Sequence, residues 1–272
     1  MALIRAYLIH HNDPDRLPQR EAITALLAQL QIPLTPIVEQ APNAPLPPGW
    51  RGRWAVLGRE CFKRTADFQQ RRLRQPRLGL ELHLRQLWKQ LQLGFCLLCS
   101  PPAVLQQRWR HNQVELIVTD KHVRAWRFAV AASAEVALVF EDDVICQPGS
   151  LQRLQQVLQQ VLRQQGLYVD LAGGYRLDAV LPLDQARPGP GWAEIWLPAV
   201  HTNTACAYLA SVPLVHCWLQ ALQRRPALAQ LPIDHLINRA SALEAPQIGS
   251  VHWFDPPFRH GSCCGLVRSW QQ

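Results

Sequence analysis

The feature that most constrains the fold of this chain is an apolar run that ends in three consecutive acids. Residues 137–140 read Ala-Leu-Val-Phe, and Glu141, Asp142 and Asp143 follow them directly. A short apolar run of this kind is typical of a buried strand, and its acids then lie at the carboxyl edge of a sheet, where ligands bind in open α/β folds. From residue 150 onward apolar residues recur at helical spacing, so a predicted amphipathic helix follows the acids.

The rest of the chain repeats this alternation of short apolar runs with helical patterns. Such alternation predicts an α/β sandwich in which helices cover both faces of a mainly parallel central sheet. The 272 residues are expected to form a single domain, with an irregular loop at about 41–54 and a mobile loop at about 182–192. Strands are predicted at 4–9, 94–100, 114–118, 135–144 and 166–174, and helices at 18–31, 64–91, 119–134 (with Thr119 or Asp120 as N-cap) and 150–162.

The composition narrows the partners and the compartment. A formal net charge of +8 attracts phosphates, nucleic acid or an anionic membrane surface. No RNA-recognition or zinc-finger signature accompanies the arginines, so nucleic acid is not an expected partner. The apolar run before His10 is too short for a signal peptide, and no stretch reaches the length of a membrane span. We therefore expect a cytoplasmic protein with buried, unbridged thiols, whose membrane contact is at most peripheral and salt-sensitive.

The three acids predict a cation site. Two carboxylates about 4 Å apart repel by about 4 kcal/mol at an effective dielectric of about 20, and a divalent cation removes that cost. Hard oxygen ligands favour Mg²⁺ or Mn²⁺, which bridges such acids to the phosphates of a ligand. The alternative is structural, with one acid capping the next turn and the others solvated.

Five separated segments of the chain together resemble one known family. They are YLIHHNDPDRLPQR with Asn12, Arg16 and Arg20; ELIVTDKHVRAW with Glu115, His122 and Trp126, followed by VFEDDV; Ala207-Tyr208-Leu209-Ala210-Ser211; Pro232-Ile233-Asp234; and WFDPPFRHGSCCGLVRS near the C-terminus. In these segments and their order the chain resembles glycosyltransferase family 25, the lipopolysaccharide and collagen galactosyltransferase-like group. It departs from the family at Ile117-Val118 and Lys121, where the family has Gly-Cys and Ser.

The resemblance implies a GT-A type, Rossmann-like fold and the transfer of a hexose, usually galactose, from a UDP-sugar to a saccharide or glycoconjugate acceptor. On this interpretation Asp143 and Glu141 hold Mn²⁺ or Mg²⁺, and His260 is the first choice for a third ligand. Asp142 is expected to meet hydroxyls of the ribose or sugar. The remaining donor contacts are expected from Asn12, Arg16, Arg20, His122 and Asn203.

An inverting reaction needs a carboxylate that takes the proton of the acceptor hydroxyl, and Asp234 fits that role. Its alternative interpretation is an N-cap for the helix that follows it. Two other functions stay open at this stage. One is a catalytically silent sugar- or nucleotide-binding protein of the same fold, which the altered segment around Lys121 favours. The other is a metal-dependent phosphodiesterase.

Overall fold

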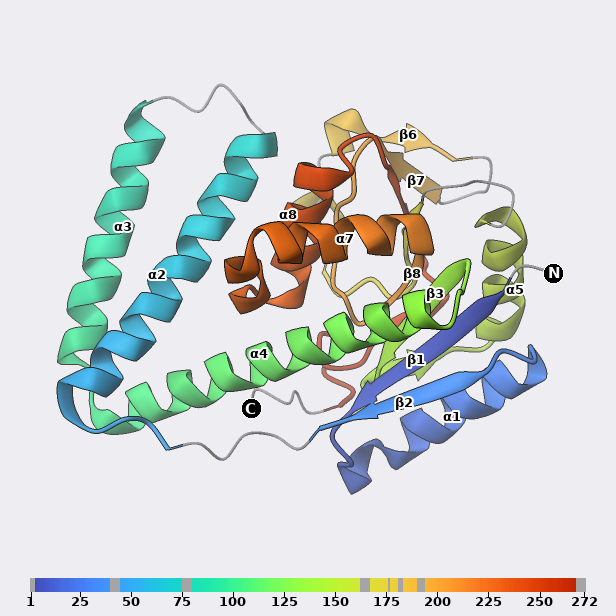
Figure 1. The fold of residues 1–272 in the computed structure, drawn as a ribbon, viewed down its shortest axis with the longest axis horizontal. Helices are drawn as coiled ribbons and strands as arrows, with labels where there is room; N and C mark the ends of the chain where they lie inside the picture. Colours follow the sequence, from blue (N-terminus) through green and yellow to red (C-terminus); the bar gives the residue numbers. More distant parts are fainter. Residues whose placement is uncertain are drawn as a thin grey trace.

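A computed structural model describes residues 3–39, 45–74, 80–161, 167–175, 177–180, 183–189 and 194–267 of the chain (Figure 1). Its centre is an eight-stranded sheet with the order β2-β1-β3-β8-β5-β9-β7-β6. The pairings are mixed: β2, β1 and β3 are parallel neighbours, as are β5 and β9, whereas β8 and β7 run against the strands beside them. The strands are β1 (Ile4–His10), β2 (Leu34–Val38), β3 (Val136–Glu141), β5 (Tyr168–Asp170), β6 (Arg187–Pro188), β7 (Glu194–Leu197), β8 (Ala207–Ser211) and β9 (Ser250–Trp253).

Helices cover both faces of this sheet, so the predicted α/β sandwich is confirmed. The prediction of a mainly parallel sheet is not, because three of the seven neighbouring strand pairs are parallel and four are antiparallel. One core joins the sheet to α4 (Pro102–Ala131), α7 (Val212–Arg224) and α8 (Ile233–Glu244), around Trp126 and Trp218, whose rings are in tilted contact. The other core joins the opposite face to α1 (Leu17–Gln29) and α5 (Ser150–Val161). Alternate residues of β3 point into the two cores, because side chains of a strand alternate between its faces.

Two long helices project from this sandwich as a hairpin (Figure 1). They are α2 (Gly49–Arg74) and α3 (Leu80–Cys99), which pack on each other through a small apolar core that includes Val56, Leu93 and Leu97. Arg53 strengthens the contact by donating hydrogen bonds to backbone carbonyls at the end of α3. The remaining described elements are short: β4 (Val144–Cys146), which pairs with β10 (Phe258–His260), α6 (Leu177–Val180), and the 3₁₀ turns Pro14–Arg16, Leu183–Gln185 and Pro226–Gln230.

Several local predictions were wrong, and all of them concern helices. Residues 94–100 and 114–118, predicted as strands, belong to the end of α3 and the middle of α4. Helix α4 begins at Pro102, so Thr119 is no N-cap; it lies inside the helix and donates to the Leu231 carbonyl. A short apolar run fits the repeat of a strand as well as the repeat of a helix. Here the residues on either side are helical, and the run continues their helix.

The two predicted loops are only partly described. The loop at 41–54 is shorter than predicted, because α2 begins at Gly49, while residues 41–44 lie outside the described part. Within the loop at 182–192, residues 183–189 form a 3₁₀ turn and the short strand β6, and the other residues lie outside the described part.

Two further expectations concern membranes and thiols. No helix among the described residues is both long enough and apolar enough to cross a membrane. All eight cysteines are unbridged, as expected. The prediction that they are buried was wrong for four of them, since Cys96, Cys99, Cys263 and Cys264 are exposed.

Candidate active site

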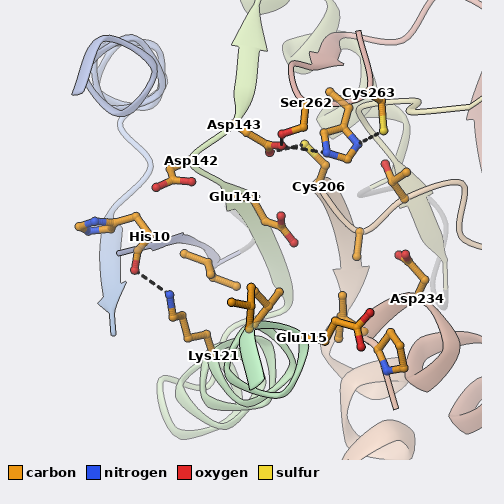
Figure 2. A pocket seen from close by; sticks show the side chains of 18 of the residues that line it. His10, Glu115, Lys121, Glu141, Asp142, Asp143, Cys206, Asp234, Ser262 and Cys263 are labelled. Atoms are coloured by element: carbon orange, nitrogen blue, oxygen red, sulfur yellow. Dashed lines mark hydrogen bonds and ion pairs between the residues drawn. The ribbon is translucent and has the colours of Figure 1, made fainter. Parts of the chain in front are cut away.

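A cavity of about 600 Å³ opens at the carboxyl ends of β1 and β3 (Figure 2). Its walls come from segments far apart in the sequence: the end of β1, helices α2, α4 and α8, the acids after β3, and the turn after β10. Of the predicted site residues, the cavity is lined by Arg16, Glu141, Asp142, Asp143, Asp234 and His260.

The three acids leave β3 in different directions. Glu141 is the last residue of the strand, and Asp142 and Asp143 form the turn into β4. Figure 2 shows Asp142 on the side of His10 and Asp143 on the side of Ser262. Alternate residues of a strand point the same way, which is why Glu141 and Asp143 were expected to act together. The strand ends at Glu141 and the chain turns at Asp142, so the two side chains do not point the same way.

Asp143 is the centre of a buried polar cluster. His260 donates to its Oδ2 over 2.9 Å, the Cys206 thiol donates to its Oδ1 over 3.2 Å, and the Ser262 hydroxyl also donates to Oδ2. Only 7% of Asp143 is exposed. A second thiol, that of Cys263, lies 3.2 Å from the other ring nitrogen of His260.

Pairing of β4 with β10 brings His260 to Asp143 across the sequence. The two strands are antiparallel, with His260 opposite Val144, and the Gly261 amide donates to the Asp143 carbonyl over 2.9 Å. A side chain at Gly261 is excluded there, since a Cβ would stand 2.6 Å from that carbonyl oxygen and 2.4 Å from Val267. The predicted approach of His260 to Asp143 thus depends on a glycine.

The charges of this pair stabilise each other. Burial disfavours a cation at His260, but the hydrogen bonds to Asp143 and Cys263 outweigh burial and raise its pKa to about 11. Burial also acts against the carboxylate of Asp143, yet hydrogen bonds from His260, Ser262 and Cys206 hold its pKa below the ordinary value. Without a metal the pair is a carboxylate and an imidazolium, and a metal that binds here displaces the imidazolium proton.

The residues around Asp143 fit a divalent transition metal. The carboxylate of Asp143, the imidazole of His260 and the thiol of Cys206 offer ligand atoms that all lie within 4.8 Å of one another. Oxygen, nitrogen and sulfur donors together suit Mn²⁺ or a softer ion better than Mg²⁺, which prefers oxygen alone. Of the three predicted metal ligands, Asp143 and His260 are in this group and Glu141 is not. Cys206 is the third member and was not predicted.

Glu141 is instead held by a buried chain of hydrogen bonds. Its Oε1 lies 3.0 Å from His122 Nε2, and His122 Nδ1 lies 2.9 Å from the Tyr208 hydroxyl, which accepts from Trp126 over 2.9 Å. Burial lowers the pKa of His122 to about 3, so the ring is neutral. When Glu141 is ionised, Tyr208 donates to Nδ1 and the Nε2 proton is donated to Glu141. Burial and the nearby Asp143 raise the pKa of Glu141 to about 8, and a protonated Glu141 donates to Nε2 while Nδ1 donates to Tyr208. His122 is fully buried and does not line the cavity; it holds Glu141, and its predicted contact with a donor remains a prediction.

The other side of the cavity is basic. Arg16 is 4% exposed and lines the wall together with His11, whose Nδ1 lies 3.4 Å from Asp142 Oδ2. Lys121, fully buried, donates to the His10 carbonyl over 2.8 Å. Burial lowers the pKa of Lys121 to about 8, against the opposing effect of Asp142 and Glu141. These residues give the cavity a basic wall beside its acids.

Asp234 stands across the cavity from the three acids (Figure 2). It is the second residue of α8, whose N-cap is Pro232 with no side-chain cap hydrogen bond, so the N-cap alternative was wrong. Its Oδ1 is buried and finds no hydrogen-bond partner among the described residues. Burial raises its pKa above the ordinary value. A carboxylate of this kind is available to accept a proton from a ligand.

Three predicted donor contacts do not line this cavity. Arg20 donates to the Asp13 carbonyl over 2.8 Å, and Asn12 lies in the same loop with a positive φ of 62°. The Asn203 side chain bonds both backbone groups of Tyr175 and lines a neighbouring hollow of about 530 Å³. Their predicted contacts with a donor remain predictions.

Sequence reasoning missed several lining residues. They include Cys206, which precedes a strand in a plain apolar segment, and Lys63, which reaches the cavity from α2 and bonds Glu115 of α4 over 2.8 Å. The adjacent helices α2 and α4 form this part of the wall, and no local pattern indicates which of their residues face it.

Comparisons with known proteins leave the family undecided. No protein-family model matches the chain, and no curated protein matches it in sequence.

Proposed function

We propose that this protein is a metal-dependent glycosyltransferase of the GT-A type that moves a hexose from a UDP-sugar to a saccharide or glycoconjugate acceptor. The observation that carries the proposal is the arrangement of two carboxylate centres in one cavity: the Asp143 cluster with its potential metal ligands, and Asp234, whose buried Oδ1 has no hydrogen-bond partner among the described residues. Donor class and sugar rest on the resemblance to glycosyltransferase family 25.

The donor diphosphate fits between the Asp143 cluster and the basic wall on the other side of the cavity. A divalent cation held by Asp143, His260 and Cys206 supplies positive charge for the leaving diphosphate. Arg16 and Lys121 add fixed positive charge from the opposite wall, where burial strengthens their effect on a phosphate. Asp142 beside them is suited to accept hydrogen bonds from hydroxyls of the donor.

The acceptor fits the side that carries Asp234. In an inverting transfer the acceptor oxygen forms a bond to the anomeric carbon while the bond from that carbon to the phosphate oxygen breaks. The acceptor proton passes to Asp234, and the electron pair of the broken bond leaves with the diphosphate. A raised pKa makes Asp234 a better proton acceptor than an ordinary aspartate.

Two alternatives share the cavity but not the product. A catalytically silent binding protein would bind a UDP-sugar without turnover. A phosphodiesterase would use water to cleave one phosphoester bond of its substrate, which gives a phosphomonoester and an alcohol and no glycoside. The main sequence argument for the silent form was that Lys121 replaces a serine of the family pattern. Lys121 lies inside α4, and its amine donates a hydrogen bond to the His10 carbonyl at the end of β1.

The proposal is tested by a panel of UDP-sugars with Mn²⁺ and simple saccharide acceptors. Glycosyltransferase activity predicts release of UDP together with a new acceptor glycoside of inverted anomeric configuration, identified by mass spectrometry and NMR. Donor binding without any product supports the silent form, and free sugar or sugar phosphate as the only product supports hydrolysis.

A further inference from the structure

The positive charge of the protein is concentrated in the α2–α3 hairpin. Residues 49–99 contain eleven Lys and Arg against three Asp and Glu, a net charge of +8. The other 221 residues contain 17 basic and 17 acidic residues and are neutral as a set. The net charge of the chain therefore equals that of residues 49–99, and all but one of the basic residues counted there belong to the two helices that project from the sandwich (Figure 1).

Helix α3 of this hairpin also exposes a continuous apolar stripe. Residues 84, 87, 88, 91 and 95 repeat at helical spacing and lie on one face. They are Leu84, Leu87, Trp88, Leu91 and Phe95, with exposed fractions of 57%, 55%, 61%, 58% and 72%. The opposite face of α3 is used for folding, since Leu93 and Leu97 are buried against α2. The stripe is thus an additional apolar surface that the fold does not need.

We propose that the α2–α3 hairpin docks on an anionic lipid surface, with the apolar stripe of α3 inserted among the lipids. Arg85 and Lys89 each follow a stripe residue by one position, so each lies about 100° around the helix from that residue, on one flank of the stripe, where Arg85 also pairs with Glu81. An aromatic and leucine stripe bordered by basic residues is the pattern of helices that lie in a membrane interface. The hairpin charge is complementary to anionic headgroups.

Charge and chemistry argue against two other occupants. A second copy of the chain would bring two hairpins of net charge +8 together, which opposes association through this face. Nucleic acid would satisfy the charge, but it offers no apolar surface to five large exposed side chains. An anionic lipid surface complements both the positive charge of the hairpin and the apolar stripe of α3. It also makes the contact only partly salt-sensitive, because insertion of the stripe does not depend on charge.

The test uses co-sedimentation of the full chain with vesicles of neutral phosphatidylcholine alone or mixed with anionic phosphatidylglycerol. Salt is set at about 0.1 M and about 1 M, where the Debye length is roughly 10 Å and 3 Å. We expect binding to the anionic vesicles that weakens but persists at high salt. Leu87→Gln and Leu91→Gln should each lower the partition coefficient roughly tenfold, and Lys89→Gln about fivefold at low salt only.

Phe254→Gln is the matched control, because Phe254 is also 67% exposed but lies outside the hairpin. It should bind vesicles as the wild type does, and circular dichroism should show that all variants are folded. Equal binding to neutral and anionic vesicles, or stripe variants that bind as well as Phe254→Gln, would overturn the proposal. So would a dimer in vesicle-free sedimentation that Leu87→Gln and Leu91→Gln dissociate, because the stripe would then be buried between copies. None of these readouts requires glycosyltransferase activity.

Discussion

Replacing Asp234 with asparagine changes the charge of the proposed base while keeping its shape. The buried Oδ1 of Asp234 has no hydrogen-bond partner among the described residues, and Asp234 provides no cap for α8. The substitution therefore breaks no contact that holds the fold. It removes the charge of the carboxylate that we propose as the proton acceptor.

The expected loss in turnover is roughly 10²–10⁴-fold, the usual contribution of a general base, which corresponds to about 3–5 kcal/mol in the activation barrier. Binding of the UDP-sugar should change little, because the donor side lies across the cavity. Stability should change in the opposite direction. Because burial raises the pKa of Asp234, the folded state holds its proton more tightly than the unfolded state does.

The charged form therefore costs stability once the pH is above the unfolded pKa, and this cost disappears as the pH falls through that value. The asparagine variant should have a higher melting temperature than the wild type at neutral pH, and this difference should vanish in acid. UDP release measures the turnover, and calorimetry at several pH values measures the melting temperature. Near-normal turnover would refute the base assignment, and a lower melting temperature at neutral pH would refute the claim that the Asp234 Oδ1 is buried without a hydrogen-bond partner.

Two further substitutions test the rest of the cavity. His122→Phe should destabilise the fold by about 1–3 kcal/mol, because Glu141 and the buried Tyr208 hydroxyl both lose a partner, and a urea titration measures this change; an unchanged midpoint would contradict the hydrogen-bond chain. Cys206→Ser should weaken binding of Zn²⁺ or Co²⁺ far more than binding of Mn²⁺, because it replaces a soft sulfur donor with a hard oxygen donor. Calorimetric titration with each metal measures the three affinities. An equal loss for all three metals would exclude Cys206 as a ligand.

Much of the sheet could be predicted from sequence because its signals are local. The run 137–140 is fully buried in the centre of the sheet, and the helical pattern after residue 150 is α5. Helix α4 could not be predicted in full, because its middle, 114–118, is apolar and β-branched over too few residues to distinguish the two periods.

The part of the site formed by consecutive residues could be predicted from the sequence. The part formed by residues that strand pairing brings together could not. The carboxylates of 141–143 are recognisable from their place after a strand. The contact of Asp143 with His260 follows from the pairing of β4 with β10, and that of Asp143 with Cys206 from the neighbouring strands β3 and β8. Neither strand pairing can be inferred from the spacing of these residues in the sequence. Lys121 departs from the family pattern, yet only the fold places it beneath β1 as a buried cation.

The most direct test of the central claim is UDP-sugar binding by Asp143→Ala, measured calorimetrically with and without Mn²⁺. Asp255→Ala removes an exposed carboxylate outside the cavity and serves as the control. We expect Mn²⁺ to increase donor affinity for the wild type and for Asp255→Ala, and to have no effect on Asp143→Ala when circular dichroism shows it folded. An equal increase in all three proteins would show that Asp143 holds no metal, and would contradict the metal-dependent donor site on which this account depends.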